Sequence, residues 1–183
     1  MKKEGISTYK IAFVSVMAAV VLVVTMFSFP LLGSKVHFGN TMCLLSGLLF
    51  GPIWGGLAAG FGSGLYDLLI GGYGVDTAII TFVSKFAMAL VCGLITRGQR
   101  ESRVRTVIGC VVGALTYVCL YMLKTFIYQR FVYGYPMETA WFTMGSKLPA
   151  SLINAVFAMI VAPILYAALK PALARAKLLD KLR

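Results

Sequence analysis

The stretch GGLAAGFGSGLYDLLIGGYG, residues 55–74, places eight glycines and one carboxylate, Asp67, among apolar residues. Three of the glycines (Gly56, Gly60 and Gly64) recur at every fourth position. On a helix they form one narrow face, and small residues at this spacing let a neighbouring helix approach closely in a membrane. The GFGSG run lacks the G-x-G-x-x-G spacing of a dinucleotide-binding turn. The stretch is therefore a packing face if it lies in lipid.

The composition of the chain indicates that this stretch lies in a membrane. Of the 183 residues, 60% are hydrophobic and only 13% are charged, and the mean hydropathy is +0.88. Soluble domains carry about 25% charged residues, so we expect a polytopic membrane protein. The net charge of +11 would suggest nucleic acid in a soluble protein. Here the basic residues cluster between apolar runs, which is typical of topology signals, and we expect no nucleic-acid partner.

The apolar runs predict an all-α fold of six transmembrane helices in a single integral membrane domain over residues 1–183. A spanning helix needs about 20 apolar residues. The predicted spans are 9–27, 36–50, 53–70, 77–96, 106–128 and 140–169. The second span is short because Gly51 and Pro52 follow it, and this pair ends a regular helix.

Positive charge predicts the orientation. Twelve of the seventeen Lys and Arg residues lie in the N-terminus, the 97–105 loop and the tail from Lys170. Cytoplasmic segments of membrane proteins carry this excess. We therefore expect a protein of the plasma membrane with both termini in the cytoplasm. The segments 28–40, 71–76 and 128–140 then face outward.

Four charged residues fall inside the predicted spans: Lys85, Lys124, Lys147 and Asp67. An ammonium group at the centre of a bilayer costs about 2.5–3.5 kcal/mol even on the lenient insertion scale. All four residues lie in the outer halves of their spans, which predicts a shared cavity that opens outward. Two alternatives stay open: the lysines can extend to the interface, and Asp67 can pair with a lysine to hold helices together.

The outer halves of the last three spans each carry a polar stripe at the spacing of one helix face. These stripes contain Thr77, Thr81 and Lys85; Tyr117, Tyr121, Lys124 and Tyr128; and Lys147, Ser151 and Asn154. The inner halves are mostly apolar. An ion channel would continue its polar lining to the cytoplasmic side, so the pattern favours a ligand cup that is closed below.

Signatures of catalysis are absent from the sequence. His37 is the only histidine, and four cysteines lie in apolar runs without C-x-x-C spacing (Cys43, Cys92, Cys110 and Cys119). We interpret these cysteines as small buried residues and expect no metal, no cofactor and no enzymatic activity. The alternatives are a stand-alone secondary transporter of a small polar solute and, less favoured, a membrane enzyme.

Two stretches carry a resemblance to a known family. HFGNTMCLLSGLLFGPIWGGLAAGFGSGLYDLL (37–69) and GGYGVDTAIITFVSKFAMALVCGLI (71–95) resemble the substrate-binding S components of energy-coupling factor (ECF) vitamin transporters, in the riboflavin-type branch. The resemblance includes the Phe-Gly-Pro turn, the glycine-rich helix and its terminal Asp. It implies a subunit that captures a vitamin or related metabolite outside the cell. Its implied partners are a membrane scaffold subunit and two ATPase subunits, which drive uptake.

The resemblance also implies functional positions. The 28–40 loop would cover the ligand, which would contact His37, Asn40, Asp67, Thr81, Lys85, Tyr117, Tyr121, Lys124, Lys147, Ser151 and Asn154. A small-residue patch on the first helix would face the scaffold, through Ala12, Ser15 and Ala19. A riboflavin-like compound, a B6 vitamer, a thiamine-related pyrimidine and a carboxylate-bearing vitamin all remain open as ligands.

Overall fold

The computed structural model describes residues 8–31, 34–97 and 102–176. Within them lie α1 (Thr8–Met26), β1 (Ser28–Leu31), β2 (Ser34–His37), α2 (Gly39–Leu69), α3 (Val75–Thr96), α4 (Arg103–Ile127), the π-helix η1 (Tyr128–Val132) and α5 (Met137–Arg175). Five helices in these residues are long and apolar enough to cross a membrane. The prediction of a helical membrane protein is therefore confirmed.

The structure has five such helices where the sequence predicts six spans. The spans expected at 36–50 and 53–70 are joined in α2, whose backbone leaves helical geometry only at Gly51 (φ 77°, ψ −173°). This left-handed φ suits glycine, and Pro52 cannot donate a backbone hydrogen bond there. The Ser46 hydroxyl donates to the Gly55 carbonyl at 2.9 Å. The two parts of α2 thus meet across a kink of one residue, without an intervening loop.

The segment predicted as an outer loop contains a two-stranded antiparallel hairpin. Ser28 lies opposite His37, and Phe29 lies opposite Val36. Residues 36 and 37 belong to β2, so α2 begins at Gly39 and not at residue 36. The prediction for the start of the second span was wrong because these residues pair with β1.

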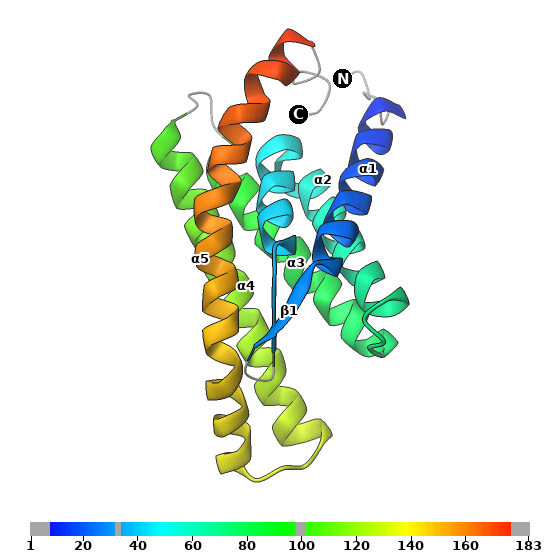
Figure 1. The fold of residues 1–183 in the computed structure, drawn as a ribbon, viewed down its shortest axis with the longest axis vertical. Coiled ribbons are helices and arrows are strands. Elements are labelled where there is room, and N and C mark those ends of the chain that lie inside the picture. Colours follow the sequence, from blue (N-terminus) through cyan, green and yellow to red (C-terminus); the bar gives the residue numbers. More distant parts are fainter. Residues whose placement is uncertain (1–7, 32–33, 98–101, 177–183) are drawn as a thin grey trace, which may run out of the picture.

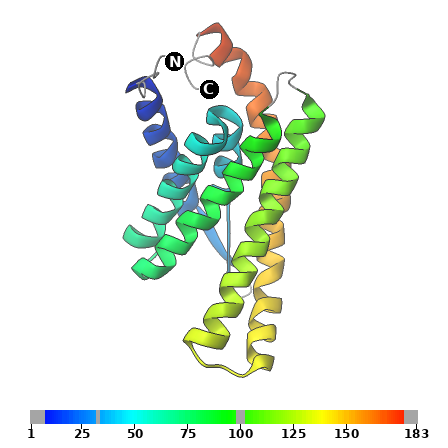
Figure 2. The same cartoon turned by 180° about the vertical axis from the view of Figure 1, so that it is seen from behind.

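The elements form two groups that are visible from both sides of the molecule (Figures 1 and 2). The long helices α4 and α5 run side by side, and α1, α2 and α3 form the other group. The β-hairpin lies between the groups. The start of α1 and the end of α5 lie at the same end of the molecule (Figure 1).

The glycine-rich stretch lets α2 pack closely against two helices. A Cβ atom at Gly60 would lie 2.9 Å from ring atoms of Phe82 on α3, and one at Gly62 would overlap the Ala18 carbonyl on α1. Helix α2 therefore lies between α1 and α3. The core beside it contains fully buried Leu44 and Met88.

Three of the four cysteines, Cys43, Cys92 and Cys110, are buried as expected, but Cys119 is exposed. The interpretation as a buried residue was wrong for Cys119, because its side of α4, which also carries Leu115 and Leu123, is exposed.

Candidate functional site

A cavity of about 550 Å³ lies at the end of the molecule opposite the start of α1 and the end of α5. It is lined by the β-hairpin, the end of α2, the first half of α3, the second half of α4 with η1, and the first half of α5. Pockets for small molecules have volumes of about 300–1,000 Å³. The cavity therefore has room for a ligand of vitamin size.

Every predicted ligand-binding residue except Asn40 lines this cavity: His37, Asp67, Thr81, Lys85, Tyr117, Tyr121, Lys124, Lys147, Ser151 and Asn154. Asn40 lies deeper, with 1% of its surface exposed, and contacts Lys85. The structure thus brings together residues of four helices and the hairpin. Their contact with a ligand remains a prediction.

Lys85 occupies the deep end of the cavity. Its side chain is 3% exposed, and its ammonium group donates a hydrogen bond to Oδ1 of Asn40. The same group lies 3.6 Å from the centre of the Tyr117 ring, close enough for a cation–π interaction. Both contacts orient the charge, and neither partner is anionic. Below this level, Met88 and Cys92 on the same helix are fully buried.

Two tyrosines on α4 form one wall. The rings of Tyr117 and Tyr121 lie 6.0 Å apart and within 22° of parallel, as expected for residues four apart on a helix. The Tyr121 hydroxyl lies 3.1 Å from Oγ of Ser34 in the hairpin. The wall therefore offers flat aromatic surface and also contacts the segment that covers the cavity.

Asn154 on α5 holds the second strand of the hairpin. Its Oδ1 accepts a hydrogen bond from the His37 backbone N–H, at 2.8 Å. Its Nδ2 donates to the Lys35 carbonyl, also at 2.8 Å. The Asn154 amide thus forms the two backbone hydrogen bonds that a neighbouring strand would form. It takes the place of the partner strand that β2 lacks on that side.

His37 is held as a neutral imidazole. Its Nδ1 accepts a hydrogen bond from the Gly39 backbone N–H at 3.1 Å, which requires an unprotonated nitrogen. Burial, and then the positive charges of Lys85 and Lys35, lower the pKa of His37 to about 3. The proton of the neutral ring is therefore on Nε2, so His37 can donate one hydrogen bond from that atom.

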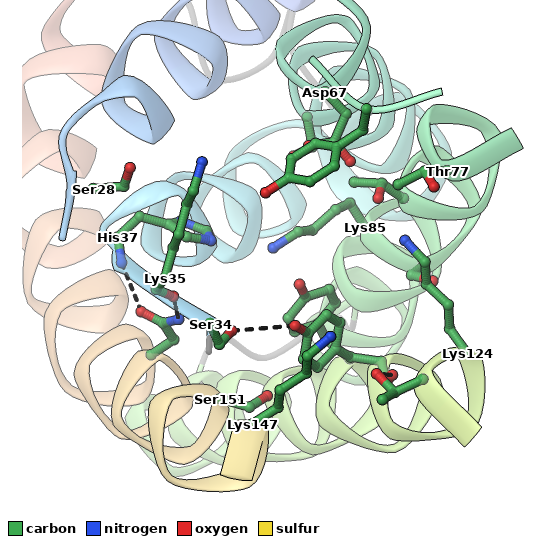
Figure 3. Close-up of a pocket in the computed structure, with 18 of the residues that line it drawn as sticks. Ser28, Ser34, Lys35, His37, Asp67, Thr77, Lys85, Lys124, Lys147 and Ser151 are labelled. Atoms are coloured by element: carbon green, nitrogen blue, oxygen red, sulfur yellow. Dashed lines mark hydrogen bonds between the residues drawn. The ribbon is translucent and has the colours of Figure 1, made fainter. Parts of the chain in front are cut away.

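The cavity is also lined by residues that were not predicted from the sequence. They include Ser34 and Lys35 in the hairpin, Tyr66 beside Asp67, and Tyr73 (Figure 3 shows most of the lining). For Tyr73 the sequence indicated only an interfacial aromatic residue. Ser34 and Lys35 lie in the 28–40 segment that was expected to cover the ligand, but they were not predicted individually. Tyr128, also in the lining, could have been selected, since it continues the polar stripe of α4.

Comparison with known proteins decides the family. The family model described as "ECF-type riboflavin transporter, S component" matches residues 5–171 of the chain. The chain belongs to this family. Its members are substrate-binding membrane subunits of ECF transporters, which work with scaffold and ATPase partners. The resemblance stated from residues 37–69 and 71–95 is therefore confirmed.

A solved structure supports the S-component fold. The structure titled "Structure and mechanism of the S component of a bacterial ECF transporter" is similar with a TM-score of 0.71 and 19% identity, over 90% of this chain and 96% of that chain. Among curated proteins, an "Uncharacterized protein in gap 3'region" of Pyrococcus woesei is 33% identical over 92 residues, or 50% of this chain. The match spans 60% of that relative's length.

The small residues predicted to contact a scaffold lie on the outside of this S component. Ala12, Ser15 and Ala19 are exposed on α1, whereas Val14, Met17 and Val21 of the same helix are buried. The three positions share one face, since they are spaced three and four residues apart. That face is exposed in the described structure, and its contact with a scaffold subunit stays a prediction.

Proposed function

We propose that this S component captures a vitamin or related small metabolite outside the cell and hands it to a scaffold subunit and two ATPase subunits for ATP-driven uptake. The observation that carries the proposal is the cavity itself. Polar side chains line it, it lies toward one end of the molecule, and apolar residues close it on the side of the opposite end. Lys85 and Ser63 are in its lining, and Met88, Cys92 and Leu44 fill the core beyond them.

The orientation proposed for this cavity rests on charge. The end of α3, the start of α4 and the end of α5 lie at the end of the molecule that holds the start of α1 (Figure 1). These helix ends carry Arg97, Arg103, Lys170 and Arg175. Cytoplasmic ends of membrane helices are enriched in Lys and Arg. If the two parts of α2 on either side of Gly51 each count as one membrane crossing, the chain crosses six times. Both termini would then lie in the cytoplasm, and the cavity would open to the outside of the cell.

The alternative is a secondary transporter that works alone. Such a protein needs a pathway that opens to each side in turn, and its sites typically lie near the bilayer midplane between structural repeats. The cavity here lies toward one end and has an apolar core below it. This geometry favours a subunit that captures its ligand and depends on partners for release.

Uptake by the reconstituted protein distinguishes the substrate-capturing subunit from the secondary transporter. The S component is placed in liposomes alone, or together with an ECF scaffold and its ATPases, and is supplied with extracts containing labelled vitamins. We expect ATP-dependent accumulation only with the partner subunits. The control replaces the ATPases with variants that bind but do not hydrolyse ATP. Accumulation by the lone protein under an ion gradient would instead establish the secondary transporter.

A further inference from the structure

The cavity carries a marked excess of positive charge. Among the described residues, the lining contains four lysines, Lys35, Lys85, Lys124 and Lys147, and one carboxylate, that of Asp67. His37 adds no charge, because its Nδ1 accepts the Gly39 N–H. The formal charge of the lining is therefore four minus one, or +3. The five charged side chains lie on five different elements around one space (Figure 3).

The contacts of these ammonium groups are with neutral partners. Lys85 donates to the amide oxygen of Asn40. Lys35 lies 5.4 Å from the ring centre of Tyr73, and Lys124 lies 5.7 Å from that of Tyr128. A buried or half-buried charge is costly unless an opposite charge compensates it. Lys35 is exposed, so the charges that need compensation are those of Lys85, Lys124 and Lys147. The carboxylates near them are Asp67 in the lining and Asp76, whose charge acts on Lys124, so compensation is incomplete without a ligand.

Two further groups in the lining can donate hydrogen bonds to a ligand. Nε2 of His37 is left as a donor, and the buried Oγ of Ser151 has no hydrogen-bond partner within the described residues. Both residues line the cavity beside Lys85 and Lys147. Lysines combined with free donors match the oxygens of a carboxylate or a phosphate, which accept several charge-assisted hydrogen bonds at once.

We infer that the ligand of this cavity is a flat aromatic compound that bears a carboxylate or phosphate, with its ring against Tyr117 and Tyr121 and its anionic group among Lys85, Lys124 and Lys147. The inference rests on the proposed function and deepens it by naming the chemical class of the cargo. It separates this S component from one whose pocket takes a neutral vitamin. A cationic compound such as thiamine would meet four like charges.

The test uses pairs of probes that share a ring and differ in charge. The pairs are riboflavin and flavin mononucleotide, pyridoxine and pyridoxine 5′-phosphate, and nicotinamide and nicotinate. Binding to the full-length protein in lipid nanodiscs is measured by calorimetry. We expect at least one anionic member to bind, about 10- to 100-fold more tightly than its neutral partner, the range for charge-assisted hydrogen bonds. The phosphate and carboxylate pairs distinguish the two anionic groups.

Two variants show where the preference arises. Lys147→Gln should weaken binding of the anionic member about tenfold or more while changing that of the neutral member little. Arg130→Gln is the matched control: it removes one positive charge from an exposed side chain of η1 that is outside the lining. Its binding should equal that of the unmodified protein.

Equal or tighter binding of the neutral members overturns the inference, as does failure of all six probes to bind. The same conclusion follows if mass spectrometry finds a neutral or cationic compound retained in the purified protein. Co-purification with the scaffold and ATPases is measured in parallel. A protein that assembles with them but prefers neutral ligands refutes only this inference, whereas a protein that fails to assemble refutes the proposed function.

Discussion

The side chain of Asn154 on α5 accepts a hydrogen bond from the backbone N–H of His37 on β2 at 2.8 Å. The same amide group donates to the Lys35 carbonyl. A single side chain thereby fixes the strand that covers the cavity to the helix that lines its far side. Asn154 therefore ties the hairpin to the ligand site, in addition to the contact between Ser34 and Tyr121.

Replacing Asn154 should release the hairpin. In Asn154→Leu the His37 N–H and the Lys35 carbonyl lose their partners, which costs about 1–3 kcal/mol when such groups stay buried. We expect faster hydrogen–deuterium exchange across residues 34–38 and unchanged exchange in α1 and α3. Thr143→Ala on the same helix, whose hydroxyl bonds only to Thr139 in its own helix, is the control. Unchanged exchange in Asn154→Leu would show that the pairing with β1 and the contact between Ser34 and Tyr121 hold the strand without Asn154.

The protonation of His37 should make stability depend on pH. Its pKa of about 3 in the folded protein lies below the ordinary value of about 6.5, so the unfolded chain binds the proton first. This residue's contribution to stability is complete above about pH 6.5 and is lost as the pH falls toward 3, by at most about 1.4 kcal/mol per pH unit.

Thermal unfolding from pH 4.5 to 7.5 measures this effect, as the difference between the unmodified protein and His37→Gln. Because His37 is the only histidine, its imidazole signals in NMR report the same titration without ambiguity. We expect no titration between pH 5 and 8. A midpoint near 6.5 in the folded protein would contradict the neutral, hydrogen-bonded imidazole.

Glycine at position 62 should be required for the contact between α1 and α2. A Cβ atom there would overlap the Ala18 carbonyl and lie 2.7 Å from Cβ of Val21, so the helices would have to separate. We expect Gly62→Ala to lower the free energy of unfolding by about 1–3 kcal/mol. The control is Gly145→Ala, which meets nothing within 4 Å and should stabilise α5 by about 0.5–1 kcal/mol. Equal stability in the two variants would rule out close packing at Gly62.

The exposed face of α1 should matter for assembly and not for ligand binding. Ala19→Trp adds bulk to the face that we propose meets the scaffold subunit, where small residues allow close helix approach. We expect loss of co-purification with the scaffold and unchanged ligand affinity. Leu115→Trp, at a position on α4 that is 45% exposed, is the control and should leave assembly intact. If ligand binding falls together with assembly in Ala19→Trp, the two faces are not separate.

Local patterns in the sequence were sufficient for the class of fold and for most of the candidate site. Hydropathy reports on the solvent of each segment, so the membrane helices were predictable. The polar stripes were predictable because residues three and four apart share a helix face in any α-helix. For this reason Lys85, Tyr121 and Lys147, on three different helices, could be assigned to one cup before their contacts were known.

The tertiary structure alone decided how these faces are covered and connected. The pairing of β1 with β2, and the hold of Asn154 on His37 across 117 residues of chain, have no local signal. The same is true of the contact between Lys85 and Asn40. Hydrogen bonds between distant segments form only after the helices have packed, because their free energy depends on burial and geometry that no single segment possesses.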